Sequence, residues 1–149
     1  MATDSIDTSD GVVARKRVYL DDLDGFGMLY HATYARLLDD AVVDFWQDAG
    51  WRLDPASQVL VIRELNLTYH APVTGICDVD VHFWVETAGS TSVTYSFEIL
   101  SADHTVRHAE GTRVIVNLDG QTWRPAPLTE EMWSIARPLL ARGFARPAA

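Results

Sequence analysis

One long amphipathic stretch, followed by segments that alternate between apolar and polar residues, constrains the fold of this chain more than any other feature. From residue 34 to residue 49 the apolar side chains recur at intervals of three and four, the spacing of one face of a helix. They are Tyr34, Leu37, Leu38, Ala41, Val42, Phe45, Trp46 and Ala49. The spacing predicts a helix of about 18 residues and roughly 27 Å, with Thr33 as a candidate cap and Gly50 as its end.

After this helix the chain alternates with a period of two, which is typical of strands that bury one face. Four such segments lie around residues 64–69, 78–86, 92–99 and 106–118. A β-rich stretch from Val12 to Leu20 predicts a further strand before the helix. Short turn-forming segments separate the later strands, which makes them antiparallel neighbours because parallel strands need crossovers of a dozen residues or more.

The order of predicted elements is therefore a strand, a long helix, four antiparallel strands and a short helix within residues 129–140. This order places one amphipathic helix against one curved sheet, and the fold class is α+β. A five-stranded antiparallel sheet wrapped around one long central helix is the hotdog fold. A cone-shaped α+β barrel of the nuclear-transport-factor type is the alternative, but it usually begins with helices, so the strand-first order favours the hotdog fold.

Composition excludes several other classes of protein. The chain has 149 residues, 48% of them apolar, and a formal net charge of −9, which argues against a nucleic-acid partner. No apolar run is long enough for a membrane span. The single cysteine, Cys77, cannot form an internal disulfide, and the amino end lacks a secretory pattern, so we expect a cytoplasmic protein. Residues 1–11 are small, polar and acidic and predict a disordered leader, with one domain over residues 12–149.

The densest cluster of polar residues lies in the loop that leads into the long helix, from Asp24 to Tyr34. A helix start offers unpaired backbone N–H groups and partial positive charge, which can bind a polarised carbonyl oxygen or an oxyanion. Gly25 and Gly27 permit a close approach of the backbone to a ligand. Asp24 can supply a carboxylate as a general base or as a nucleophile, and this combination predicts acyl-transfer chemistry.

The segment DGFGMLYHATYARLLDDA closely resembles the D-x-x-G-x-x-Y-H-x-x-Y signature of the 4-hydroxybenzoyl-CoA thioesterase-like branch of hotdog proteins, which includes acyl-CoA thioesterases associated with the Tol-Pal system. The resemblance extends to LNLTYHAPVTGICDVDV and WRPAPLTEEM and covers roughly residues 12–140. It implies that Asp24 is the catalytic carboxylate and that the backbone N–H of His31 polarises the thioester carbonyl. It also implies substrate contacts from Gly27, Tyr30 and Tyr34.

The chain departs from this family at two positions, because Leu20 and Leu23 stand where members often have Tyr and Thr. The contacts that support Asp24, the rate of the reaction and the substrate can therefore differ from those of the family. The imidazole of His31 has two interpretations: it contacts the substrate or orients water, or it packs beside Tyr30 while only its backbone acts. Asp39, at the margin of the apolar helix face, is a candidate for a supporting role in a cleft.

Other candidate sites are weaker. The remaining histidines have no ligand-like spacing, so we expect no metal and no cofactor. Cys77 has no basic neighbour in the sequence that would activate a thiol. Tyr69 ends a predicted strand and can line an acyl channel or a subunit contact.

The leading functional hypothesis is hydrolysis of an acyl thioester carried by CoA or by an acyl-carrier protein. The alternatives are hydration or dehydration of an acyl thioester, and a non-catalytic acyl-CoA binding module. We also expect a homodimer or homotetramer, because a small open sheet leaves edges that pair with a second copy. The family resemblance implies a site shared between subunits, with Tyr69 or Arg63 of one subunit near the Asp24 loop of another. Exposed aromatic contacts are expected at Tyr19, His82, Trp84 and Trp123.

Overall fold

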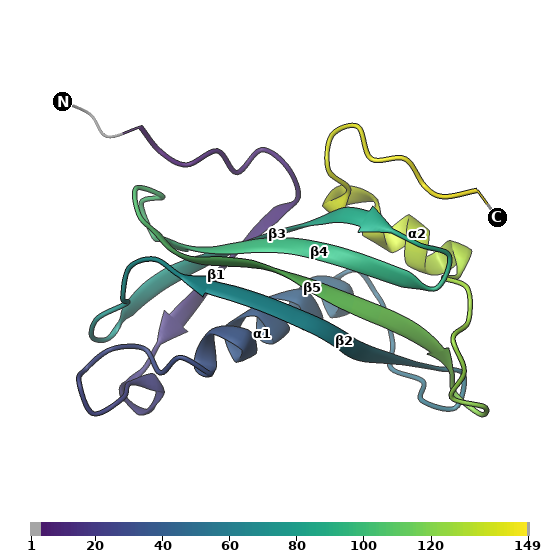
Figure 1. Ribbon diagram of the computed structural model, residues 1–149, viewed down its shortest axis with the longest axis horizontal. Coiled ribbons are helices and arrows are strands. Elements are labelled where there is room, and N and C mark those ends of the chain that lie inside the picture. Colours follow the sequence, from purple (N-terminus) through teal and green to yellow (C-terminus); the bar gives the residue numbers. More distant parts are fainter. Residues whose placement is uncertain (1–3, 149) are drawn as a thin grey trace.

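The computed structural model describes residues 4–148 and contains the predicted elements in the predicted order (Figure 1). Two short 3-10 turns, η1 and η2, adjoin the first strand and the last helix. The elements are β1 (Val12–Val18), η1 (Leu20–Asp22), α1 (Thr33–Asp48), β2 (Gln58–Tyr69), β3 (Cys77–Ala88), β4 (Ser92–Ser101), β5 (Arg107–Asp119), α2 (Glu130–Ala136) and η2 (Arg137–Leu139). No helix among the described residues is both long enough and apolar enough to cross a membrane.

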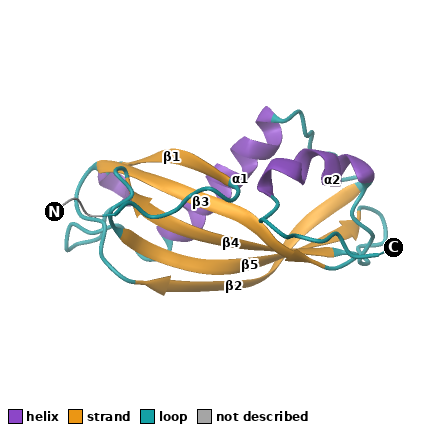
Figure 2. Ribbon diagram, turned by 90° about the horizontal axis from the view of Figure 1, so that it is seen from above, coloured by secondary structure: helices purple, strands orange, loops and turns teal. Residues whose placement is uncertain are grey.

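The five strands form one sheet in the order β1-β3-β4-β5-β2, and every neighbouring pair is antiparallel. Figure 2 shows the strands in this order, with α1 running along one face of the curved sheet. The predicted α+β class and hotdog architecture are confirmed. β1 and β2 form the two edges, and β2 carries a bulge between Ile62 and Glu64 that leaves Arg63 without a partner in the register.

The core lies between α1 and the concave face of the sheet. The predicted apolar face of the helix is confirmed, since Tyr34, Leu37 and Leu38 are nearly fully buried against strand residues such as Phe83 and Phe97. One detail of the helix prediction was wrong. The residue at the N-cap is Ala32, which makes no side-chain cap bond, and Thr33 is already helical. Gly50 follows the helix with a φ of +94°, a conformation that favours glycine.

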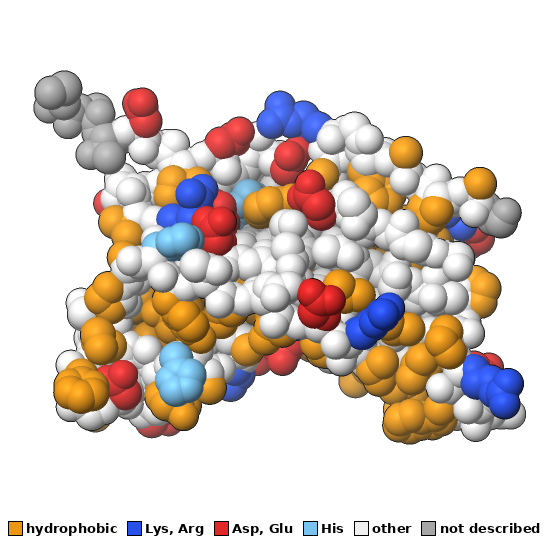
Figure 3. All heavy atoms as spheres, in the orientation of Figure 1, with side chains coloured by type: hydrophobic (Ala, Val, Ile, Leu, Met, Phe, Trp, Pro, Cys, Tyr) orange, Lys and Arg blue, Asp and Glu red, His pale blue; other side chains and the backbone are white. Residues whose placement is uncertain are grey.

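The convex face of the sheet is polar, and charged side chains on it pair with one another. Arg15 Nε donates to Asp80 Oδ1 at 2.9 Å, and His104 Nε2 lies 2.6 Å from Asp80 Oδ2. Burial opposes ionisation of the Asp80 carboxyl, but the hydrogen bonds from Arg15 and His104 outweigh it and lower its pKa. Figure 3 shows acidic, basic and histidine side chains close together over the sheet. A strip of ion pairs therefore links β1, β3 and the turn after β4.

The segment before β1 contacts this convex face. The predicted disordered leader begins with residues 1–3, which lie outside the described residues. Residues 4–10 form no helix or strand, yet the N–H of Ile6 donates to the carbonyl of His104 at 2.8 Å, and the carbonyl of Asp10 lies 2.5 Å from His82 Nε2. The expectation that His82 is exposed was wrong, since this contact and the neighbouring strands leave it 2% exposed. Tyr19 and Trp123 are exposed, as expected, and Trp84 is half-buried.

Candidate active site at the start of the central helix

The loop between β1 and α1 holds the Asp24 carboxylate in a tight turn. Asp24 Oδ1 accepts hydrogen bonds from the N–H of Phe26 at 2.8 Å and of Met28 at 3.2 Å. The N–H of Gly27 donates to the carbonyl of Asp24, and the φ of Gly27 is +77°, which explains glycine at this position. Among the described residues nothing donates to Oδ2 of Asp24. One carboxylate oxygen is thus fixed and the other is available to a ligand.

This loop is fastened to the segment that joins β2 to β3. The N–H of Leu29 donates to the carbonyl of Val73 at 2.8 Å, and the N–H of Gly75 donates to the carbonyl of Gly27 at 3.0 Å. Leu29 and Val73 are both buried, so the anchor is part of the core. The position of Asp24 is therefore set by the sheet as well as by its own turn.

The start of α1 presents backbone donors next to this loop. The N–H of Thr33 donates to the carbonyl of Tyr30 at 2.9 Å, whereas the N–H groups of His31 and Ala32 have no acceptor within residues 4–148. The imidazole of His31 is exposed and lies against the ring of Tyr30, with centroids 4.4 Å apart. Two unpaired donors at a helix start form a site for an oxygen that carries partial negative charge.

Two tyrosines support this helix start. The hydroxyl of Tyr69 donates to the carbonyl of His31 at 2.7 Å, and the rings of Tyr69 and Tyr34 meet edge to face at 5.0 Å. Burial raises the pKa of both phenols above its ordinary value, so both stay protonated at neutral pH. Tyr69 therefore holds the backbone of His31 in its own chain.

The remaining candidates lie elsewhere or play no visible part. Tyr30 is half exposed beside His31, and Arg63 lies at the β2 bulge, six residues along the strand from Tyr69. Burial raises the pKa of the half-buried Cys77 thiol, which disfavours the reactive thiolate. Within the described part of the chain, no three His, Cys, Asp or Glu side chains are placed to hold a metal ion.

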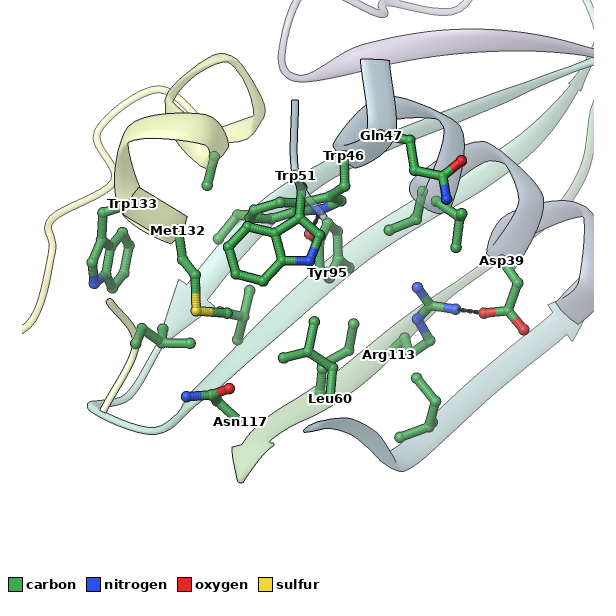
Figure 4. A pocket seen from close by; sticks show the side chains of 18 of the residues that line it. Asp39, Trp46, Gln47, Trp51, Leu60, Tyr95, Arg113, Asn117, Met132 and Trp133 are labelled. Carbon is green, nitrogen blue, oxygen red and sulfur yellow. Dashed lines mark hydrogen bonds and ion pairs between the residues drawn. The ribbon is translucent and has the colours of Figure 1, made fainter. Parts of the chain in front are cut away.

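A cavity of about 330 Å³ lies between the second half of α1 and the concave face of the sheet, closed at one end by α2. Figure 4 shows the aromatic side chains of Trp46, Trp51 and Tyr95 in its wall. Trp46 Nε1 donates to the hydroxyl of Tyr95 at 3.0 Å, and the rings of Trp46 and Trp51 meet at 5.7 Å. Burial raises the pKa of Tyr95 to about 12. Apolar and aromatic side chains make up most of the wall.

Two buried polar residues of β5, Arg113 and Asn117, interrupt this apolar wall. The Arg113 side chain is 5% exposed and its Nη1 donates to Asp39, whose side chain is 58% exposed (Figure 4). Nε of Arg113 and Oδ1 of Asn117 are buried and have no hydrogen-bond partner within residues 4–148. Neither residue was singled out from the sequence. Counting along β5 in steps of two from buried Ala109 passes through both, and this alternation is the signal that could have found them.

Comparisons with known proteins point to one family. The model of the thioesterase-like superfamily matches residues 18–135. The acyl-CoA thioester hydrolase YbgC of Escherichia coli is 25% identical over 122 residues, which cover 78% of this chain and 88% of that protein.

Solved structures share the fold. Slr0204 from Synechocystis, described as a 1,4-dihydroxy-2-naphthoyl-CoA thioesterase, superposes with a TM-score of 0.76 at 20% identity, covering 83% of this chain and 93% of that one. The PA5185 protein of Pseudomonas aeruginosa gives a TM-score of 0.79 at 20% identity, with 89% and 94% covered.

Proposed function

Because the chain belongs to the thioesterase-like superfamily and is a thioester hydrolase, we propose that it cleaves acyl-CoA thioesters with the Asp24 carboxylate and the N–H groups at the start of α1. One observation supports this assignment above the others. In the part of the chain that the structure describes, a carboxylate with one free oxygen lies in a loop that leads directly to a helix start with two unpaired donors. These are the two components that hydrolysis of a thioester needs, a group that delivers the nucleophile and a group that stabilises the oxyanion.

The helix start binds the thioester carbonyl. The N–H groups of His31 and Ala32 donate to the carbonyl oxygen, and they bind it more strongly as it gains negative charge during attack. The partial positive charge of the helix N-terminus acts in the same direction. Tyr69 contributes by holding the carbonyl of His31, which fixes the peptide plane that carries the N–H of Ala32.

Asp24 supplies the second component through its free oxygen, Oδ2. This oxygen either takes a proton from the attacking water or attacks the thioester carbon itself and forms an anhydride that water then hydrolyses. In both routes the thiolate of CoA leaves with a proton from solvent. A single turnover in water labelled with heavy oxygen identifies attack by Asp24 if water opens the anhydride at the Asp24 carbonyl, because the label then enters the enzyme and an Asp24 oxygen enters the released acid.

The site is shared between two copies of the chain. β2 pairs only with β5 among the described strands, so its outer edge is open. Leu60, Ile62, Leu65 and Tyr69 of this strand are each 41 to 50% exposed, an apolar row at an unpaired edge. Such an edge favours pairing with a second copy, as a homodimer or as part of a homotetramer. Arg63 then lies at the same subunit contact.

Free thiol release from a panel of acyl-CoAs and acyl-carrier proteins tests the proposal. We expect release from thioesters and a decrease of kcat by at least about a hundredfold in Asp24→Asn, since loss of a general base or nucleophile typically costs two to four decades. Asp21→Asn, an exposed acid of the same loop, is the matched control and keeps its activity. Retained activity in a folded Asp24→Asn variant contradicts the assignment. Conversion of an enoyl thioester without thiol release indicates a hydratase.

A further inference from the structure

We infer that the cavity beneath α1 holds the acyl group of the substrate, and that Arg113 selects acyl groups that carry an oxygen acceptor at their far end. The inference rests on the proposed thioester hydrolysis and specifies its substrate class. The acyl groups of this class share an oxygen that accepts hydrogen bonds. This oxygen belongs either to a terminal hydroxyl or to a terminal carboxylate.

The cavity has the size and lining of an acyl site. Its volume of about 330 Å³ falls at the lower end of small-molecule pockets. Trp46, Trp51, Met132 and Trp133 contribute much of the wall, so the body of the acyl group is apolar.

Arg113 gives this apolar cavity its chemical selectivity. A guanidinium carries five N–H donors, but within the described residues only Nη1 of Arg113 has a protein acceptor. A buried donor without an acceptor is costly, and an acceptor on a ligand removes that cost. The face of the Tyr95 ring, 5.9 Å from the guanidinium carbon, stabilises the charge without accepting its remaining hydrogen bonds.

Asp39 leaves room for a ligand oxygen. Its side chain is 58% exposed, so solvent can stabilise the carboxylate if a ligand displaces it from Arg113. Arg113 is almost fully buried and has no such alternative. The pair is thus asymmetric: the cation is fixed in the cavity wall, and its present partner lies at the solvent side.

The opening of the cavity faces the edge that a second copy covers. Val43, Leu60 and Ile62 line the cavity and are each 42 to 50% exposed, so they mark its mouth. Antiparallel pairing of two β2 strands places the Tyr69 end of one beside the Gln58 end of the other. The helix start of one copy then adjoins the cavity mouth of its partner. Within one copy, neither His31 nor the buried Tyr34 lines the cavity.

Hydrolysis of matched thioesters tests the inference. The substrates are CoA thioesters of straight-chain acids, their ω-hydroxy acids and their α,ω-dicarboxylic acids, at each chain length from about six to twelve carbons. We expect wild-type kcat/KM to favour at least one oxygen-ended substrate over the plain chain of the same length by about tenfold or more. Arg113→Met removes this ratio, and Arg142→Met, an exposed arginine outside the cavity, retains it.

Calorimetric Kd values for CoA thioethers, in which CH2 replaces the thioester carbonyl and the far ends are the same, provide a readout without catalysis, with the same expected order and the same loss in Arg113→Met. Thioester hydrolysis by the wild type without any preference for oxygen-ended chains overturns the inference and leaves the proposed function intact. A preference that survives in Arg113→Met also overturns it. Selective binding of the oxygen-ended thioethers without thiol release from any thioester supports the cavity assignment and contradicts the proposed function. If Arg113→Met fails to fold, the absence of a wild-type preference still overturns the inference.

Discussion

The Asp24 carboxylate is positioned by the turn that it helps to form. Its Oδ1 accepts two backbone N–H groups from residues that follow it, and this leaves Oδ2 for chemistry. Asp39 has the opposite arrangement, because it lies on a regular helix and its partner is a buried arginine. In the proposed reaction, two aspartates fifteen positions apart therefore have different tasks, one at the reacting carbonyl and one at the far end of the acyl group.

At the residue scale, the two interpretations of His31 predict different kinetics. The ring contacts Tyr30 and makes no hydrogen bond within residues 4–148, whereas the backbone N–H faces the proposed oxyanion. We expect His31→Ala to lower kcat by less than about tenfold, because the substitution keeps the N–H. Thiol-release kinetics measure the effect, and circular dichroism checks the fold. A loss as large as that of Asp24→Asn instead makes the imidazole a catalytic partner.

The residues at the helix start could be predicted from the sequence because they form one continuous segment. Asp24, Gly27, His31 and Tyr34 lie within eleven consecutive positions, so a sequence motif contains their spacing. Arg113 could not be placed in the same way. Its contact with Asp39 joins residues 74 positions apart. Whether an arginine in a strand is buried also depends on how the helix packs over that part of the sheet, which the sequence of the strand does not show.

At the scale of elements, the pairing of β2 with β5 depends on a residue without a side chain. A Cβ added at Gly111 would lie 1.8 Å from the carbonyl oxygen of Asn66, which is far too close. We expect Gly111→Ala to lower the free energy of unfolding by about 1–3 kcal/mol or more, through displacement of the edge strand. Chemical denaturation measures this change.

Gly25→Ala is the control for this measurement, because a Cβ there meets no atom within 4 Å. We expect a change within about 0.5 kcal/mol for this substitution. An equally small effect of Gly111→Ala contradicts the close approach of β2 and β5.

The helices and strands were predictable because their apolar spacing is a local property of the sequence. The start of α2 is also a local property of the sequence. The side chain of Thr129 accepts a hydrogen bond from the N–H of Met132 and caps this helix. The bulge near Arg63 was not predictable. It arises from the register between β2 and β5, which is set by contacts across the sheet rather than by the order of residues in one strand.

At the scale of the whole molecule, the open β2 edge predicts the oligomeric state. We expect sedimentation equilibrium at micromolar concentration to give a dimer or a larger assembly of the 16.6 kDa chain. Leu65→Lys places a charge in the exposed apolar row and shifts the protein toward the monomer, with loss of thioesterase activity.

Val13→Lys, a substitution of a 39% exposed residue on the opposite edge strand, is the matched control and keeps the assembly. A fully active species of 16.6 kDa contradicts the shared site. Dissociation by Val13→Lys but not by Leu65→Lys assigns the contact to the β1 edge.

The aromatic wall of the cavity also gives the protein an optical signal of its own. Three of the five tryptophans, Trp46, Trp51 and Trp133, line that wall, while Trp84 and Trp123 lie outside it. A ligand that fills the cavity displaces solvent from these three indoles and changes their emission, and the other two supply a constant background. Stopped-flow fluorescence of the unlabelled protein can therefore time the entry of an acyl group separately from cleavage of the thioester.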